Sequence, residues 1–179
     1  VTVAVYTGLR PGELLALAVE DVAPDFSKIL VRRSITQSVT FKVPKTNKER
    51  TVLLHPPARD ALKVLIADAE KREPADLQVW LNRHEARTDR VRVLLSPKTQ
   101  ARKKVVNEYF VPSAWNTKWA NLIRRSGIRS RPPYQTRHTF ACWNLTARGN
   151  LAFIANQMGH GDYSMLVKVY GRWIDSESP

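Results

Sequence analysis

Five side chains, spread from one end of the chain to the other, are of types that could together transfer a phosphodiester. They are Arg10 in TGLRPGELLAL, Lys45 in VPKTNKERTV, Arg137 in YQTRHTFA, His160 in QMGHGD and Tyr170 in KVYGRW. Such a transfer without a metal needs a nucleophile, cations around the non-bridging oxygens and an acid for the leaving oxygen. A tyrosine, two arginines with a histidine, and a lysine can fill these roles in that order.

Arg10 immediately precedes Pro11, where a helix is expected to begin. A helix N-terminus favours anions, and a guanidinium beside it can hold a phosphate through two parallel hydrogen bonds. Taken alone, however, the sequence RPGE is more typical of a surface turn. Glu13 lies in the first turn of the same helix. It is expected either to stabilise the helix dipole or to orient one of the arginines.

Lys45 lies in the polar turn KTNKE, which is expected at the tip of a β-hairpin. A flexible ammonium at such a tip can reach a leaving oxygen and protonate it. Lysine is also common on exposed hairpin tips for no catalytic reason. Lys48, three residues further along, is a competing candidate.

Tyr134 and Arg137 are three residues apart at the start of a predicted helix, so they share a face and could clamp a phosphate. The neighbouring His138 is expected to point into the packing. His160 lies in a Gly-His-Gly turn after a helix end. Such a turn can present an imidazole to a site, although a capping or solvent-exposed role suits it equally.

Tyr170 belongs to a helical stripe of apolar and aromatic residues at positions i, i+3, i+4 and i+7. The other members are Tyr163, Leu166 and Val167. Stripes of this kind usually form the buried face of a helix, so spacing alone favours packing over catalysis. Only the complete set of five residues favours a catalytic tyrosine.

The elements that must position these residues are mainly helical, with one small three-stranded antiparallel β-sheet. A first helix is expected to close at Gly8, and a second to begin at Pro11 and include residues 13–22. Residues 27–54 are rich in β-branched side chains and predict the sheet. Further helices are expected over residues 58–72, 113–128, 135–149, 151–159 and 163–173. Residues 73–112 remain unassigned except for a short strand in RVRVLL.

Composition points to a single domain with a polyanionic partner. A chain of 179 residues can bury about 70% of its unfolded surface. It has 29 Lys and Arg against 16 Asp and Glu, a formal net charge of +13, which favours nucleic acid, although an unspecialised basic surface would look the same. The single cysteine, Cys142, excludes an internal disulfide and suits a reducing cytosol. The sequence contains no apolar run of membrane-spanning length and no cleavable signal.

Two blocks of the sequence resemble the catalytic domain of the tyrosine recombinases, the phage integrase family. TGLRPGELLAL resembles the family's first arginine box, and RPPYQTRHTFACWNL through QMGHGDYSMLVKVYGRW resembles its second. The resemblance covers nearly the whole chain and implies the fold of the DNA breaking-rejoining enzymes. We expect residues 1–179 to form this catalytic domain, as a fragment without the N-terminal domain with which the family clamps DNA.

The resemblance also implies a role for each residue. Arg10 and Arg137 would bind the phosphate, Glu13 would support the first arginine, Lys45 would protonate the leaving oxygen, His160 would be the late histidine of the site and Tyr170 the nucleophile. The product would be a covalent 3′-phosphotyrosyl link and a free 5′ hydroxyl, formed without metal, ATP or any other cofactor. The expected partners are double-stranded DNA and, on that DNA, three further copies in a tetramer. The protein is expected in the cytoplasm of a bacterium, at the nucleoid. Its gene would belong to the bacterium or to a phage.

Two positions depart from the family's pattern. The family usually has a histidine three residues before the second arginine, whereas this chain has Tyr134. A phenol can donate a hydrogen bond but cannot act as a base near neutral pH. Ten residues separate His160 and Tyr170, one more than is common in the family, and we interpret this as a subfamily feature.

Four other functions remain open from the sequence. The chain could be a DNA-binding module without chemistry, a topoisomerase-like enzyme that relaxes supercoils, or an integrase-like domain without activity. A metal-dependent nuclease would need clustered ligands, but Glu20, Asp21 and Asp25 are expected in a surface turn. Candidate contacts to the DNA backbone are Lys48, Lys103, Lys104, Arg129 and Arg131, although a solvated basic face explains them equally well.

Overall fold

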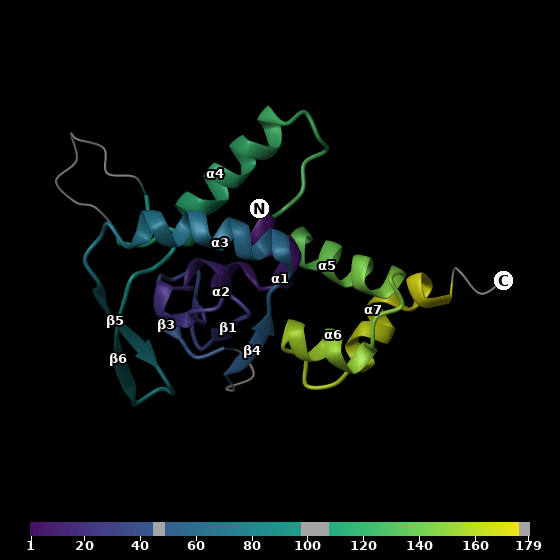
Figure 1. The fold of residues 1–179 in the computed structure, drawn as a ribbon, viewed down its shortest axis with the longest axis horizontal. Coiled ribbons are helices and arrows are strands. Elements are labelled where there is room, and N and C mark those ends of the chain that lie inside the picture. Colours follow the sequence, from purple (N-terminus) through teal and green to yellow (C-terminus); the bar gives the residue numbers. More distant parts are fainter. Residues whose placement is uncertain (45–48, 98–107, 176–179) are drawn as a thin grey trace.

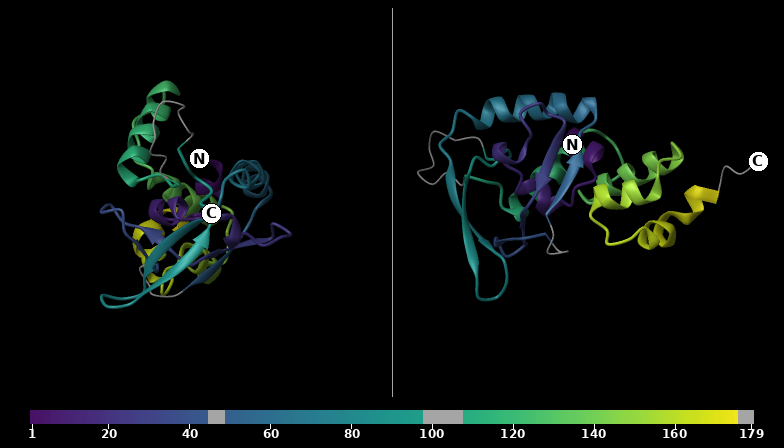
Figure 2. Two further views of the ribbon diagram at one scale, coloured as in Figure 1. Left: turned by 90° about the vertical axis from the view of Figure 1, so that its left-hand side faces the viewer. Right: turned by 60° about the horizontal axis from the view of Figure 1, so that its bottom comes forward.

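The computed structural model describes residues 1–44, 49–97 and 108–175, the last four of these as backbone only. The helices are α1 (Thr2–Thr7), α2 (Pro11–Leu15), α3 (Pro56–Ala69), α4 (Pro112–Arg125), α5 (Gln135–Thr146), α6 (Leu151–Met158) and α7 (Ser164–Asp175), with a short 3-10 helix at Val19–Asp21. The strands are β1 (Lys28–Val31), β2 (Ser34–Ile35), β3 (Phe41–Lys42), β4 (Arg50–Leu53), β5 (Ala75–Trp80) and β6 (Ala86–Val91). Helices α5, α6 and α7 gather at one end of the molecule and the β5–β6 hairpin lies at the other (Figures 1 and 2).

The first turn of the chain follows the prediction. Helix α1 ends at Gly8, whose φ of +64° is the left-handed conformation that favours glycine. A Cβ at this position would lie only 2.6 Å from Cδ1 of Phe140 in α5, so the glycine also permits close packing. Helix α2 then begins at Pro11, with its fixed φ at the first helical position.

The prediction that this helix continues to residue 22 is wrong. Helix α2 ends at Leu15, and a 3-10 turn follows at Val19–Asp21. The Ala18 amide donates to the Asp21 carboxylate at 2.9 Å, and the Val19 amide donates to the Arg92 carbonyl. Because these donors find partners outside the helix, the backbone leaves the helical path.

The prediction of one three-stranded antiparallel sheet is also wrong, because the strands divide between two sheets. Strands β1 and β4 form an antiparallel pair, and the second sheet has the order β2-β3-β5-β6 with β3 and β5 parallel. The break falls between β1 and β2, where the buried Arg33 side chain turns inward to the Ala16 carbonyl and the Asp21 carboxylate. Strand β5 lies in the unassigned stretch, although Ala75, Leu77 and Val79 alternate with polar residues and Trp80, a pattern typical of a strand. The short strand predicted in RVRVLL overlaps β6 only at Arg90 and Val91.

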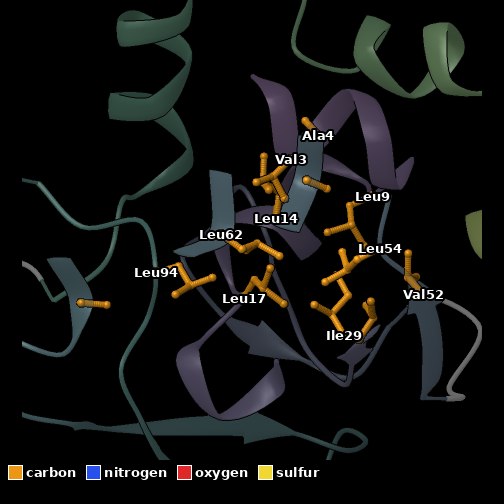
Figure 3. Packing of buried hydrophobic residues seen from close by; sticks show 13 residues of the cluster. Val3, Ala4, Leu9, Leu14, Leu17, Ile29, Val52, Leu54, Leu62 and Leu94 are labelled. Carbon is orange, nitrogen blue, oxygen red and sulfur yellow. The ribbon is translucent and has the colours of Figure 1, made fainter. Parts of the chain in front are cut away.

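The helices predicted from apolar spacing are confirmed as α3 to α7, with ends that differ by a few residues. The largest apolar cluster joins α1, α2, β1, β4 and α3 (Figure 3). A separate cluster joins α5, α6 and α7 through residues such as Phe140, Ile154 and Leu166. Helix α5 packs on α1, and α6 packs on β4. These contacts bring the second sequence block against the first.

Candidate active site

A buried carboxylate organises the first half of the site. Glu13 is 2% exposed, and its two oxygens accept four hydrogen bonds from two arginines. Arg10 donates from its backbone amide and from Nη1, both at 2.9 Å. Arg50 donates from Nη1 at 3.0 Å and from Nη2 at 2.7 Å. The carboxylate thus caps the first turn of α2 and holds the Arg10 side chain in place.

Arg50 is a member of the site that the sequence analysis missed. It lies at the start of β4, and its Nε donates to the Gln157 carbonyl at the end of α6, at 3.2 Å. The Gln157 side chain in turn accepts from the Leu53 amide at 2.8 Å. The first arginine box, the sheet and α6 are therefore tied together through one guanidinium.

The charges around Glu13 keep it ionised. Burial alone would raise its pKa, but the hydrogen bonds and charge of Arg50, followed by those of Arg10, outweigh burial and hold the pKa below its ordinary value of 4.5. The carboxylate therefore remains an acceptor for both arginines at neutral pH.

Arg137 forms the second half of the site. Its side chain is almost wholly buried, with Nη1 donating to the Gly8 carbonyl at 2.6 Å and Nη2 lying 2.8 Å from Nε2 of His160. A guanidinium only donates, so Nε2 of His160 accepts and the proton of the neutral ring lies on Nδ1. Burial, followed by the charge of Arg10, lowers the pKa of Arg137 to about 10, which leaves it charged at neutral pH.

His160 lies where the two halves meet. It follows Gly159, which ends α6 with a φ of +69° and whose carbonyl accepts from Nη2 of Arg10 at 3.3 Å. Nδ1 of His160 is buried and has no hydrogen-bond partner among the described residues. Burial, followed by the charges of Arg137, Arg10 and Arg50, lowers the pKa of His160 to about 4. The free site thus holds a neutral imidazole among three cations.

Tyr170 lies beside this cluster on α7, in a largely buried position with 6% exposure. Its hydroxyl is 2.5 Å from Nδ1 of His138. Burial raises the pKa of Tyr170 to about 12, although the nearby charge of Arg137 acts to lower it. The tyrosine is therefore a neutral phenol, electrostatically coupled to Arg137.

The helical stripe that contains Tyr170 is only partly core. Leu166 is buried with Tyr170, whereas Tyr163 and Val167 are exposed. His138 does pack against aromatic rings, as expected, between Tyr134 and Tyr170. Its hydrogen bond to the Tyr170 hydroxyl was missed, because the two residues are 32 positions apart and nothing in the local pattern connects them.

The remaining candidates lie elsewhere. Tyr134 precedes α5, half exposed, with its ring at the edge of the His138 ring. Arg129 and Arg131 are exposed in the connection between α4 and α5. Lys45, Lys48, Lys103 and Lys104 lie outside the described residues.

Glu20, Asp21 and Asp25 are not gathered at one point. The expectation that Asp21 lies in a surface turn is wrong, because Asp21 is buried and pairs with Arg32 and Arg33. Glu20 and Asp25 are exposed. Within the described ranges, no three His, Cys, Asp or Glu side chains come close enough to hold a metal ion.

Among the described residues, no helix is long and apolar enough to cross a membrane.

Comparison with solved structures identifies the fold. The Tn1549 transposon integrase, in complex with a circular intermediate DNA, superposes with a TM-score of 0.75 over 94% of this chain and 52% of its own, at 17% identity. XerA recombinase gives a TM-score of 0.63 at 23% identity, over 93% of this chain and 49% of its own. The catalytic domain of bacteriophage HP1 integrase gives 0.54 at 20% identity, over 98% and 73%.

Comparison with sequences gives nearer relatives. Prophage integrase IntR of Escherichia coli K12 is 42% identical over 96% of this chain, and the defective protein IntQ of the same strain is 39% identical over 98%. The match spans 42% of the first relative and 45% of the second, so this chain corresponds to somewhat less than half of each. The model of the phage integrase family matches residues 1–176. With this match along nearly its whole length, and with relatives at this level of identity, the chain belongs to the phage integrase family.

Proposed function

We propose that this chain is the catalytic part of a site-specific DNA recombinase that cuts and rejoins strands through a covalent 3′-phosphotyrosyl intermediate. One observation carries the proposal. Arg10 and Arg137 are far apart in the sequence, yet both contact the Gly159–His160 turn. Two guanidiniums and an imidazole at one point are a suitable binding site for a phosphate.

In the proposed reaction, the Tyr170 oxygen attacks the scissile phosphorus and the bond to the 5′ oxygen breaks. Arg10 and Arg137 stabilise the charge that develops on the non-bridging oxygens, which is the electrostatic part of catalysis. Lys45 protonates the departing 5′ oxygen. The protein–DNA ester retains the energy of the broken bond, so that a 5′ hydroxyl can reverse the step without ATP or metal.

His160 is proposed to change state when DNA binds. The positive charges around it help to keep it neutral in the free protein. A bound phosphate brings negative charge that opposes this field and raises the pKa of the imidazole. The added proton lies on Nε2, which then no longer accepts from Arg137, so that Nε2–H and the freed Nη2 of Arg137 can both donate to phosphate oxygens.

The proposed partners are double-stranded DNA and other copies of the same protein in a tetramer on that DNA. The net charge of +13 supports DNA as a partner, and so does the structural likeness to integrases and recombinases solved with DNA. The tetramer and a site of action at bacterial or phage DNA in the cytoplasm follow from the family alone. No cofactor enters the proposed reaction.

The test is covalent capture from a library of nicked duplexes with a randomised segment, in which the cleaved fragment diffuses away and traps the intermediate. Wild-type protein should retain DNA after denaturation in detergent, also in EDTA, whereas Tyr170→Phe should retain none. Tyr163→Phe is the matched control, because Tyr163 lies immediately before the same helix, α7, but is 54% exposed.

The outcomes separate the alternatives. Reversible binding of DNA without any covalent capture would support a DNA-binding module or an inactive domain. Loss of capture in EDTA would support metal chemistry. Relaxation of supercoiled plasmids without regard to sequence would support a topoisomerase.

A further inference from the structure

The hydroxyl of Tyr170 has one hydrogen-bond partner in the described part of the chain, Nδ1 of His138 at 2.5 Å. In the tautomer with the ring proton on Nε2, the phenol donates this part-buried hydrogen bond and Nδ1 accepts it. Burial, followed by the charge of Arg137, lowers the pKa of His138, which keeps its ring neutral and able to accept at neutral pH.

The chemistry of Tyr170 calls for such an acceptor. With a pKa of about 12, only about one Tyr170 in 10⁵ is ionised near pH 7. The position where the family usually has a histidine holds Tyr134, whose phenol cannot take up a proton near neutral pH. Nε2 of His160 is already engaged by Arg137.

We propose that His138 is the general base of the cleavage step and takes the proton of Tyr170 on its Nδ1. The inference rests on the function proposed above. As the bond from Tyr170 Oη to phosphorus forms, the phenol proton passes to Nδ1, the bond from phosphorus to the 5′ oxygen breaks, and that oxygen receives a proton from Lys45. In the rejoining step each proton returns along the same path.

The surroundings of His138 suit this role. The charge of Arg137, its neighbour on α5, acts on the ring, and Cys142 follows one turn later on the same helix. The Tyr134 ring from the start of α5 and the Tyr170 ring from α7 both lie against it. The Tyr134 ring lies edge-on at a centroid distance of 5.3 Å and limits the rotation of the imidazole. Tyr134 thus acts as a positioning residue. The base, His138, lies one helical turn after the position where the family usually has a histidine.

The test compares His138→Asn with His138→Ala on a DNA sequence captured from the library. Asparagine places a carbonyl oxygen close to the position of Nδ1, so it can accept the hydrogen bond but cannot take the proton. The rate of covalent capture in a single turnover should fall about 10²- to 10⁴-fold in both variants, the usual contribution of a general base. A His138→Asn rate close to wild type would overturn the proposal and leave His138 a purely positioning residue.

The pH profile gives a second readout. Above about pH 7 the wild-type rate should be flat, whereas the His138→Asn rate should rise about tenfold per pH unit as the tyrosinate fraction grows. Parallel profiles would count against a proton transfer to His138. If wild-type protein captures no DNA at all, the proposed function fails and the inference falls with it, which is a different result from rapid capture by the variant.

A measurement without DNA guards against variants that do not fold. The ¹⁵N chemical shifts of His138 in wild-type protein should show an unprotonated Nδ1 and a protonated Nε2 near neutral pH. A proton on Nδ1 would contradict the proposal directly.

Discussion

Replacing Glu13 by glutamine should destabilise the fold far more than the loss of one charge on the surface. The carboxylate is 2% exposed and receives four hydrogen bonds from Arg10 and Arg50. Glutamine keeps one of the two oxygens but replaces the other by an NH₂ group, which faces the arginine N–H donors and cannot accept from them. Breaking a buried pair in this way costs about 3–5 kcal/mol, because Arg50 remains buried without its counter-charge.

For a domain of this size, each kcal/mol corresponds to about 2–4 °C, so the melting temperature should fall by about 6–20 °C. Glu49→Gln is the matched control, since Glu49 also accepts two hydrogen bonds from one arginine, Arg87, but in an exposed pair. Such pairs contribute about 0.2–1 kcal/mol. Urea and thermal unfolding of the three proteins measure the difference.

The pH dependence tests the cause. The folded-state pKa of Glu13 lies below 4.5, so the stability from its pairing is fully present above that value and disappears as the pH falls through the folded pKa. The difference in the free energy of unfolding between wild type and Glu13→Gln should be largest near neutral pH. It should shrink in acid, where Glu13 is itself protonated. A Glu13→Gln protein as stable as Glu49→Gln, or a gap that is constant into strong acid, would refute the reasoning.

Three further outcomes follow from the geometry. An NMR titration should give His160 a pKa near 4. The free energy of unfolding should then decline as the pH falls from 6.5 toward 4, because only the unfolded chain takes up the proton in that range, and His160→Gln should flatten this slope. A His160 that titrates near 6.5 would contradict this prediction. Gly8→Ala should lower the free energy of unfolding by more than about 1 kcal/mol, because the φ of Gly8 is +64° and the new Cβ would lie 2.6 Å from Phe140. The control Gly161→Ala, with open space around its Cβ, should be nearly neutral. Equal unfolding midpoints for the two variants would contradict this prediction. DNA affinity measured by fluorescence anisotropy should fall steeply, by about 10³-fold or more between low and moderate salt, as counterion release requires, and a salt-independent affinity would oppose phosphate binding.

Local patterns in the sequence predict the framework of the site. The Gly8 stop, the Pro11 start and the apolar spacing of the later helices are all set by interactions within a few residues, and all are confirmed. The first arginine box and its acid also form a local unit, since Arg10 and Glu13 are three residues apart.

The parts that sequence reasoning missed depend on distant partners. Arg50 meets Glu13 across 37 residues, and His138 meets Tyr170 across 32. The single predicted sheet is split because Arg33 is drawn to Asp21, a buried pair that no local pattern distinguishes from two surface charges. Such contacts are decided by the packing of the whole chain.

The central claim is that the oxygen of Tyr170 becomes bonded to the 3′ phosphate of a cut DNA strand. The most direct measurement is mass spectrometry of the protein–DNA adduct after digestion with trypsin and nuclease. The account predicts a nucleotide joined through its 3′ phosphate to Tyr170 in the tryptic peptide VYGR, residues 169–172. A nucleotide on any other residue, or one joined through its 5′ phosphate, would contradict it.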